Sequence, residues 1–445
     1  MVWLINFLIL LVVAFFDDKT CREVMGYLYI IQYISFISYI YYATDKKINI
    51  KYFFTPTFLT LSYVSLTFGF AALYLNAELG FLTKFVTIYK NSPSFKLVNF
   101  YFLICNFILF FIYFKNFKKN KFLINKFQIN RNLIKKNTFI VAFIVFFLFS
   151  FIQLDASIFG GNGDLSFVPK FLSCIVITFY LSAKRFKYRL LVYGLLLCVF
   201  LASNFDSKRE IMFLLIAILY VEFLLNDLHI NLSIKNILFF ILGGSLFMSI
   251  IIVASIFRGY GSFKVNTIYD AFVLIPEYIK SDFFLDAIGE NLELNYSYGN
   301  ALNAADLFLE GKTRLLYGET VAKALFVPLP KSIFEYKPRS IVEIYSPLIN
   351  NGTGEIQPVV IYSEFLWNFS IIFFIPLYMF FWFSEKIYKD ILFQVKKNRL
   401  SLLLLLELFY ITTILQFVRG SGLDLFVVYI IICLPFAFLF KTVNN

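Results

Sequence analysis

Charged residues are scarce in this chain of 445 residues. Asp, Glu, Lys and Arg make up 15% of it, against 60% hydrophobic residues, and the mean hydropathy is +0.77. A soluble domain carries about 25% charged residues, so this chain lacks the polar surface that would face water on every side. The shortage excludes an ordinary soluble fold and predicts an integral membrane protein.

Histidine and cysteine are also rare. The five cysteines form no Cys-x-x-Cys pair and four lie inside apolar runs, so neither a disulfide framework nor a zinc site is indicated. The one histidine, His229, falls in a segment predicted to be cytoplasmic, which leaves no histidine for chemistry on the outer side. There is no Walker A sequence, and the first apolar run lacks the features of a cleavable signal peptide. We therefore expect no metal and no cofactor.

Long apolar runs dominate the rest of the chain. At about 20 residues per span, they predict an all-α, polytopic transmembrane helix bundle with about 12 spans. The runs are Val2–Phe16, Met25–Ala43, Pro56–Leu75, Val98–Phe114, Thr138–Leu154, Val168–Ala183, Leu190–Phe205, Ile211–Leu225, Ile237–Phe257, Phe365–Phe383, Leu400–Phe417 and Leu425–Phe440.

The positive charges are concentrated in short loops between these runs. Lys115–Lys136 holds eight Lys and Arg residues, Lys184–Arg189 four and Lys386–Arg399 five. Cytoplasmic loops of membrane proteins carry such an excess, and all three loops fall on one side when the spans alternate. We therefore expect both termini to be cytoplasmic, and we attribute the net charge of +12 to membrane orientation rather than to nucleic-acid binding.

One long loop, Arg258–Ser363, is expected on the outer side. It carries nine basic and 12 acidic residues, so it is nearly neutral. The chain thus divides into residues 1–257 with nine spans, the loop at 258–363, and residues 364–445 with three spans. Apolar spacing within the loop predicts short helices, the first of them amphipathic, whereas prolines predict an irregular stretch after the last helix. The helices are Tyr269–Ile279, Ala301–Leu309 and Thr320–Phe326; the prolines are Pro328, Pro330, Pro338, Pro347 and Pro358.

Three arginines are predicted at the outer membrane face, where topology gives no reason for positive charge. They are Arg209, Arg258 and Arg419, and the last two are each followed by glycine. A guanidinium group binds phosphate through two parallel hydrogen bonds, so three of them at one depth would suit a lipid diphosphate. The alternative is that these arginines only anchor helix ends at the interface.

Carboxylates provide the candidate base. Glu364 begins the tenth span at the outer face, where it could take a proton from a sugar hydroxyl or simply cap a helix. Glu407 lies inside a span and requires a polar partner. The acidic residues Asp306, Glu310 and Glu319 of the loop are expected mostly on a solvated face.

Two stretches carry a family resemblance. The loop contains Tyr317-Gly-Glu-Thr-Val-Ala-Lys-Ala-Leu-Phe-Val-Pro-Leu-Pro330, followed by Ile333-Phe-Glu-Tyr-Lys-Pro338, and the tenth span is preceded by Pro358-Val-Val-Ile-Tyr-Ser-Glu364. These resemble the main periplasmic loop, and the glutamate-containing start of the next span, in bacterial O-antigen (oligosaccharide repeat unit) polymerases of the Wzy type. Arg419-Gly420 in a late outer loop also matches. Ser370 stands where that family usually has glycine.

The resemblance implies a glycosyltransferase of the bacterial inner membrane, active in O-antigen and lipopolysaccharide biosynthesis. It would transfer a growing glycan from undecaprenyl diphosphate onto a lipid-linked repeat unit. Glu364, Arg258 and Arg419 are the expected catalytic residues. A second set is expected to bind substrate: Arg209, Arg314, Lys337, Arg339 and Tyr345. Expected partners are the undecaprenyl-diphosphate-linked glycans, membrane lipid, a chain-length regulator and a flippase, but no nucleic acid.

Three alternatives remain open. A lipid-linked oligosaccharide flippase or another multi-pass transporter also has many spans, although such proteins usually place their polar residues at the membrane midplane. An O-antigen ligase shares the architecture, but that family carries an outer-loop histidine that this chain lacks. A membrane scaffold without chemistry is the third.

Overall fold

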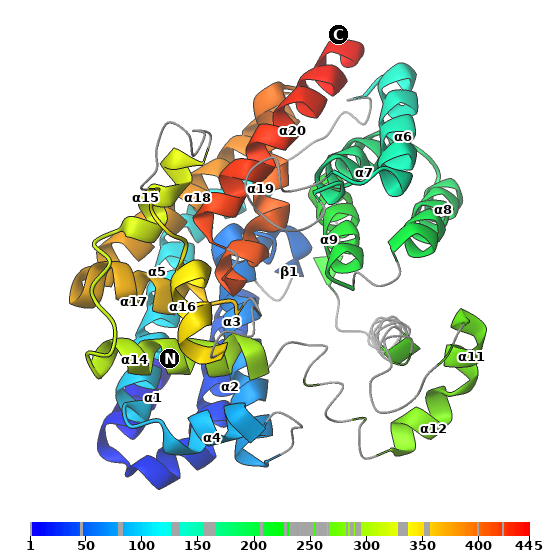
Figure 1. The fold of residues 1–445 in the computed structure, drawn as a ribbon. Coiled ribbons are helices and arrows are strands. Elements are labelled where there is room, and N and C mark those ends of the chain that lie inside the picture. Colours follow the sequence, from blue (N-terminus) through cyan, green and yellow to red (C-terminus); the bar gives the residue numbers. More distant parts are fainter. Residues whose placement is uncertain are drawn as a thin grey trace.

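The computed structural model is almost entirely helical (Figure 1). It describes residues 2–44, 48–78, 83–125, 134–154, 165–204, 208–226, 229–230, 267–281, 295–327, 337–350, 357–397, 400–420 and 422–445, with scattered residues between 238 and 289. Within these ranges the β structure is one pair of two-residue strands, β1 (Ile48–Asn49) and β2 (His229–Ile230). The prediction of an all-α fold is confirmed.

Six helical segments in the described residues are long and apolar enough to cross a membrane. The fourth of them is a run of 36 residues formed by two helices and a 3-10 turn. Because every backbone group in hydrocarbon needs a partner within the chain, helices of this kind are what a spanning segment requires. The six are α2 (Asp18–Ala43), α3 (Pro56–Asn76), α5 (Phe95–Asn125), α17 (Ile361–Phe369) with η5 (Ser370–Phe373) and α18 (Phe374–Lys396), α19 (Leu402–Arg419) and α20 (Leu423–Asn444).

Five further helices coincide with predicted runs. They are α1 (Val2–Phe15), α6 (Lys136–Phe151), α7 (Phe167–Leu181), α8 (Phe186–Asn204) and α9 (Lys208–Leu225). Several of these are apolar but shorter than a typical span. Eleven of the twelve runs are therefore helical, and the remaining run, Ile237–Phe257, lies largely outside the described residues.

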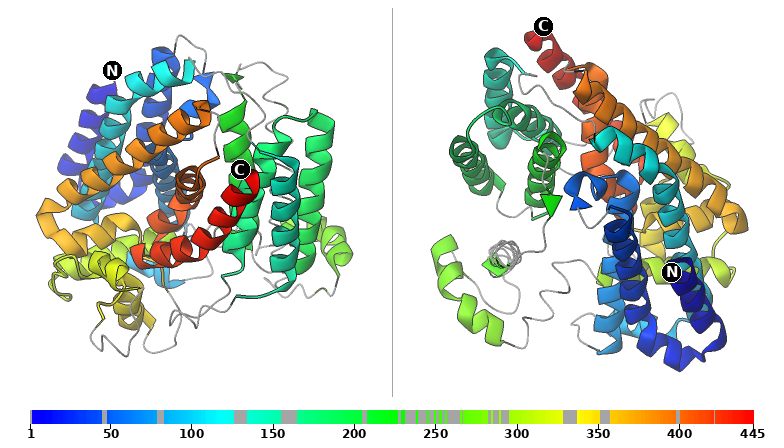
Figure 2. Two further views of the ribbon diagram at one scale, coloured as in Figure 1. Left: turned by 90° about the horizontal axis from the view of Figure 1, so that it is seen from above. Right: turned by 180° about the vertical axis from the view of Figure 1, so that it is seen from behind.

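The helices form two groups with a pair between them. Helices α6 to α9 pack on one another, and α1, α2, α3, α5 and α18 form the other group. Helices α19 and α20 pack on each other between the two groups (Figures 1 and 2). Helix α19 contacts α3 and α18 on one side and α7 and α9 on the other, whereas α20 contacts α6 and α7. The main core is a continuous cluster of buried apolar residues that extends through both groups. A smaller cluster, which includes Tyr345 and Trp367, lies between the loop helices and α17.

The segments between these helices hold shorter elements. Two of them match the predicted Ala301–Leu309 and Thr320–Phe326 closely. The elements are η1 (Ile50–Tyr52), α4 (Thr83–Asn91), α11 (Ile268–Val273), α12 (Ile275–Lys280), the π-helical turn η4 (Asn295–Gly299), α14 (Asn300–Leu309), α15 (Glu319–Phe326) and α16 (Ile341–Asn350).

Two predictions for the long loop were wrong in detail. The single helix expected over Tyr269–Ile279 is divided at Leu274 into α11 and α12, because Pro276 cannot donate a backbone hydrogen bond and fits only the first turn of a new helix. The irregular stretch expected after Thr320–Phe326 contains α16, which has Pro347 in its interior.

A chain of polar side chains crosses the apolar core of the first group. The Gln32 amide donates to Asn6 Oδ1 at 2.9 Å, and the Asn106 amide donates to Gln32 Oε1 at 3.0 Å. The Tyr362 hydroxyl completes the chain by donating to Asn106 Oδ1 at 2.8 Å. All four side chains are fully buried, and unpaired polar groups would be costly there. The chain therefore ties α1, α2, α5 and α17 together.

Contacts between loops agree with the predicted alternation of the spans. Strands β1 and β2 pair two segments that are both expected to be cytoplasmic, and the backbone N–H of Lys135 donates to Asn444 Oδ1 near the C-terminus. Two segments expected outside also meet, since α4 packs on α14.

Candidate functional site

Helix α17 places Glu364 under the loop helix α15. Glu364 lies in the first turn of α17 and its side chain is 2% exposed. The Thr320 hydroxyl of α15 donates a hydrogen bond of 2.7 Å to Glu364 Oε1. Asn368, one turn further along α17, donates to Thr320 Oγ1 at 2.8 Å and accepts from the Thr320 backbone N–H. The three side chains hold α15 against α17.

A lysine on the same loop helix joins two acidic residues. Lys323 Nζ lies 2.7 Å from Glu343 Oε2, at the beginning of α16, and 3.1 Å from Asp424 Oδ2, in the first turn of α20. The side chains of Lys323 and Asp424 are each 16% exposed, so this ion pair is shielded from solvent and screened less than a surface pair. Asp424 also lies within electrostatic range of Glu364. We call Thr320, Lys323, Glu343, Glu364, Asn368 and Asp424 the Glu364 cluster.

Arg419 ends α19 beside this cluster. A cation at the last turn of a helix interacts favourably with the helix dipole. The next residue, Gly420, has φ +112° and lies so close to Val359, just before α17, that an added Cβ would be 2.1 Å from the Val359 carbonyl oxygen. This close approach fixes the end of α19 against the beginning of α17, so it brings the backbone of Arg419 to the same end of the bundle as Glu364.

The predicted substrate-binding residues of the loop range from exposed to fully buried. Arg314 and Arg339 are exposed: Arg314 forms an ion pair of 2.7 Å with Glu319, and the backbone N–H of Arg339 faces the same carboxylate at 3.5 Å. Lys337 is partly buried. Tyr345 is fully buried, and burial raises the pKa of its phenol, so it stays protonated. Its hydroxyl donates to the Asn300 carbonyl oxygen at 3.2 Å, which fastens α16 to α14. Tyr345 therefore holds two loop helices together.

Two of the three predicted diphosphate arginines cannot be placed. Arg258 lies outside the described residues, and the side chain of Arg209, near the beginning of α9, does as well. Arg419 alone is placed, and the predicted common depth of the three stays a prediction.

The structure corrects the prediction for Asp306 and bears out the one for Glu407. Asp306, expected on a solvated face, is 5% exposed because it lies on the buried face of α14. Burial raises the pKa of its carboxyl to about 6. Glu407 in α19 has the polar partner that its position demanded, since the Gln394 amide donates to Glu407 Oε2 at 2.8 Å.

Electrostatics within the Glu364 cluster keep one acid ionised. Burial raises the pKa of Glu343, but hydrogen bonds from Lys323 and from the Ser340 backbone outweigh it, so that the pKa lies below its ordinary value. Among the residues that the structure describes, no group of three or more His, Cys, Asp or Glu side chains could hold a metal ion. The charged groups of the cluster are three carboxylates and one lysine, which can transfer protons and stabilise charge.

Four members of the cluster were not singled out from the sequence. Asn368 stands four residues after Glu364, a spacing that places both on one face of a helix, so this pair was detectable. Thr320, Lys323 and Asp424 meet through contacts between segments far apart in the chain, which no local pattern encodes.

Comparisons with protein-family models, with curated proteins and with solved structures find no significant match to this chain.

Proposed function

We propose that this chain is a polymerase of bacterial surface polysaccharide in the inner membrane. In this proposal it has about 12 spans, both termini are cytoplasmic, and residues 258–363 form a periplasmic loop. The observation that supports it best is the Glu364 cluster: a buried carboxylate at the end of the long apolar helices, covered by a loop helix and next to the end of α19 that carries Arg419.

The proposed reaction is transfer of a glycan from one lipid diphosphate to a sugar hydroxyl of another lipid-linked unit. Glu364 takes the hydroxyl proton, the hydroxyl oxygen bonds to the anomeric carbon of the donor, and the bond from that carbon to the diphosphate oxygen breaks. Arg419, with Arg258 and Arg209, stabilises the negative charge on the departing undecaprenyl diphosphate. Because α15 covers Glu364 in this structure, the proposal requires α15 to withdraw when substrate binds, and its return would exclude water.

A Glu364→Gln variant tests the base. The substitution keeps the shape and the hydrogen bond from Thr320 but removes proton acceptance, which is typically worth about 10²–10⁴ in rate. We expect normal protein abundance and surface glycan reduced to single repeats. Glu407→Gln is the matched control, because Glu407 is also a poorly exposed carboxylate in a candidate span, yet lies outside the cluster with Gln394 as its partner. Full-length polymer from Glu364→Gln would remove Glu364 as the base.

The arginine role has its own test. Arg419→Lys keeps the charge but loses the bidentate hydrogen bonds that a guanidinium group forms with a phosphate. We expect polymer length to fall while the protein accumulates normally. If Arg419→Lys makes wild-type polymer, anchoring of the helix end is the better explanation of Arg419.

The proposed orientation is open to chemical labelling. Single cysteines introduced near residues 126 and 396 should be protected from a membrane-impermeant thiol reagent added outside, whereas a cysteine near residue 312 should react. The reverse pattern would invert the topology and place the Glu364 cluster in the cytoplasm.

A transporter of lipid-linked oligosaccharide is the second candidate. The observation in its favour is the buried chain Asn6–Gln32–Asn106–Tyr362, because transporters place polar groups inside their helical bundle. The lipid-linked and surface glycans of a deletion strain distinguish these functions. Single repeats on the surface indicate a polymerase, internal accumulation without surface sugar indicates a flippase, and polymer retained on the lipid carrier indicates a ligase.

A further inference from the structure

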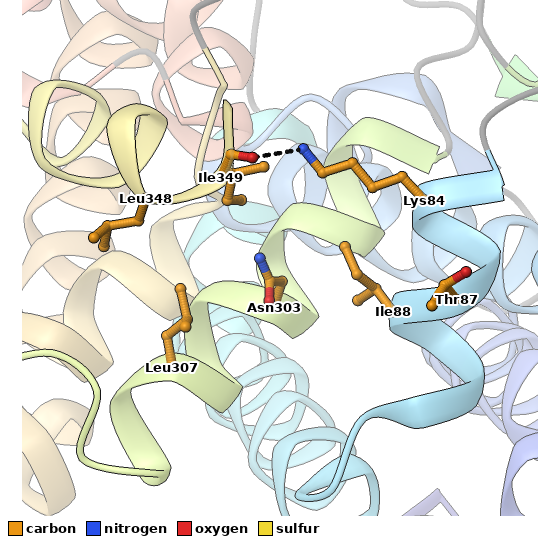
Figure 3. A pocket seen from close by; sticks show the side chains of 7 residues that line it. All are labelled: Lys84, Thr87, Ile88, Asn303, Leu307, Leu348 and Ile349. Carbon is orange, nitrogen blue, oxygen red and sulfur yellow. Dashed lines mark hydrogen bonds between the residues drawn. The ribbon is translucent and has the colours of Figure 1, made fainter. Parts of the chain in front are cut away.

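A groove of about 410 Å³ lies between three short helices. It is bounded by α4, α14 and α16, and Figure 3 shows their side chains around a common space. The Lys84 side chain extends across one edge and donates to the Ile349 carbonyl oxygen at 3.2 Å. The groove is lined by Lys84, Thr87, Ile88, Asn303, Leu307, Leu348 and Ile349.

The lining combines two chemistries. Four aliphatic side chains provide apolar surface, while an amide, a hydroxyl and an ammonium group provide hydrogen-bonding capacity. The Asn303 amide is oriented by its own hydrogen bond to the Tyr345 hydroxyl, at 3.3 Å. Sugars present the same combination, with apolar C–H faces and hydroxyls around the ring. Among the described residues of the lining, Lys84 carries the one charged group, and that group donates to the Ile349 carbonyl oxygen.

Helix α14 separates the groove from the Glu364 helix. On one side, its Ala301 and Ala304 carbonyl oxygens accept hydrogen bonds from Ser363 and Trp367 of α17. On another side, Asn303 and Leu307 line the groove. An α-helix is about 10–12 Å across with its side chains, so an oligosaccharide whose end reaches Glu364 could extend over α14 into the groove. The volume also lies within the roughly 300–1,000 Å³ typical of small-molecule sites.

We propose that this groove binds sugar units of the glycan, remote from the bond being formed. The identity of the glycan rests on the proposed function, whereas saccharide binding by the groove does not require Glu364 to be a base. Binding at such a distance fixes the position of the acceptor, and interactions with non-reacting parts of a substrate contribute to orientation at the reacting centre.

Binding of a released oligosaccharide tests this site directly. The full-length protein, purified in detergent, is titrated by calorimetry with the repeat-unit oligosaccharide obtained from the producing strain by mild acid hydrolysis. Leu348→Trp fills the groove, and Lys84→Met removes the ammonium while preserving most of the side-chain volume. We expect each to weaken binding about tenfold or more. Leu309→Trp, an exposed residue of α14 outside the lining, is the matched control and should bind as the wild type does.

The same measurements test the groove assignment independently of the polymerase proposal. Glu364→Gln should bind the oligosaccharide with unchanged affinity, because Glu364 belongs to α17 and does not line the groove. Full-length polymer from Glu364→Gln together with lost binding in the groove variants would overturn the base and leave the groove assignment standing. Unchanged affinity in both groove variants overturns the groove assignment, as does a wild-type protein that binds no saccharide. A Leu348→Trp protein that loses co-purifying lipid but keeps saccharide affinity would identify a lipid site instead.

Discussion

Thr320 and Glu364, 44 residues apart in the sequence, are joined by a buried hydrogen bond of 2.7 Å between the Thr320 hydroxyl and Glu364 Oε1. The same hydroxyl oxygen accepts a hydrogen bond from the Asn368 amide. One threonine side chain thus satisfies two polar groups of α17, and the attachment of the loop helix α15 depends on it.

We expect Thr320→Val to destabilise the protein. Valine has the same shape but leaves Glu364 Oε1 without this donor, at a cost of about 1–3 kcal/mol. The Asn368 amide also loses one of its two acceptors and keeps the other, the Glu364 carbonyl oxygen. Thr320→Ser retains both hydrogen bonds and is the control. Thermal unfolding in detergent measures the effect, and equal midpoints for the two variants would show that the hydrogen bonds contribute little.

Gly420→Ala should abolish accumulation of folded protein. An added Cβ would lie 2.1 Å from the Val359 carbonyl oxygen, a distance that only a backbone shift relieves. Gly311 is the control: it also has positive φ, at +70°, but an added Cβ there meets nothing within 4 Å. Alanine at Gly311 should therefore cost only about 1–2 kcal/mol of backbone strain. Similar abundance of the two variants would contradict the close contact.

Ser370→Gly should stabilise the protein by about 1 kcal/mol. Ser370 has φ +49° and ψ −138°, a conformation that glycine adopts without steric penalty and a side chain resists. This residue follows α17 and is the first residue of η5, and it occupies the position where the sequence resemblance expects glycine. Ser370→Ala removes the hydroxyl but keeps the Cβ, so it should show no gain. A stabilised Ala variant would assign the effect to the hydroxyl.

We expect the free energy of unfolding to fall as pH rises from about 4 to about 6, because of the buried carboxyl of Asp306. Burial raises the folded-state pKa to about 6 from an ordinary value of 3.8, so the folded protein holds the proton through this interval while the unfolded chain releases it. Ser92, Glu310 and Arg22 are the other groups that act on this carboxyl. Asp306→Asn cannot titrate, and its unfolding midpoint should lose this pH dependence. An unchanged pH profile in the variant would remove Asp306 as the cause.

The sequence predicts the apolar helices well because burial in a membrane imposes a long hydrophobic run on each of them. It predicts α14 and α15 for a related reason, since their apolar spacing follows the helical period. It fails at α16, where Pro347 suggested a break. It also fails at Asp306, because local spacing does not indicate which face of α14 packs on the bundle.

The candidate site was predictable only in part. Glu364 and Arg419 were selected by their positions at the ends of apolar runs, and both lie at the same end of the bundle. The cover over Glu364 was not predicted, since Thr320 and Lys323 acquire their roles through partners that are 44 and 101 residues away in the sequence, Glu364 and Asp424. Arrangements of this kind depend on tertiary packing rather than on propensity.

The buried chain from Asn6 to Tyr362 also bears on how the protein is synthesised. Ribosomes release the N-terminal helices first, so Asn6, Gln32 and Asn106 can pair with one another long before α17 exists. Asn106 Oδ1 then lacks the donor that it has in the finished protein until Tyr362 emerges, 256 residues later. A chain stalled or truncated before α17 would expose an unpaired amide oxygen in the membrane interior, a defect that cellular quality control could recognise.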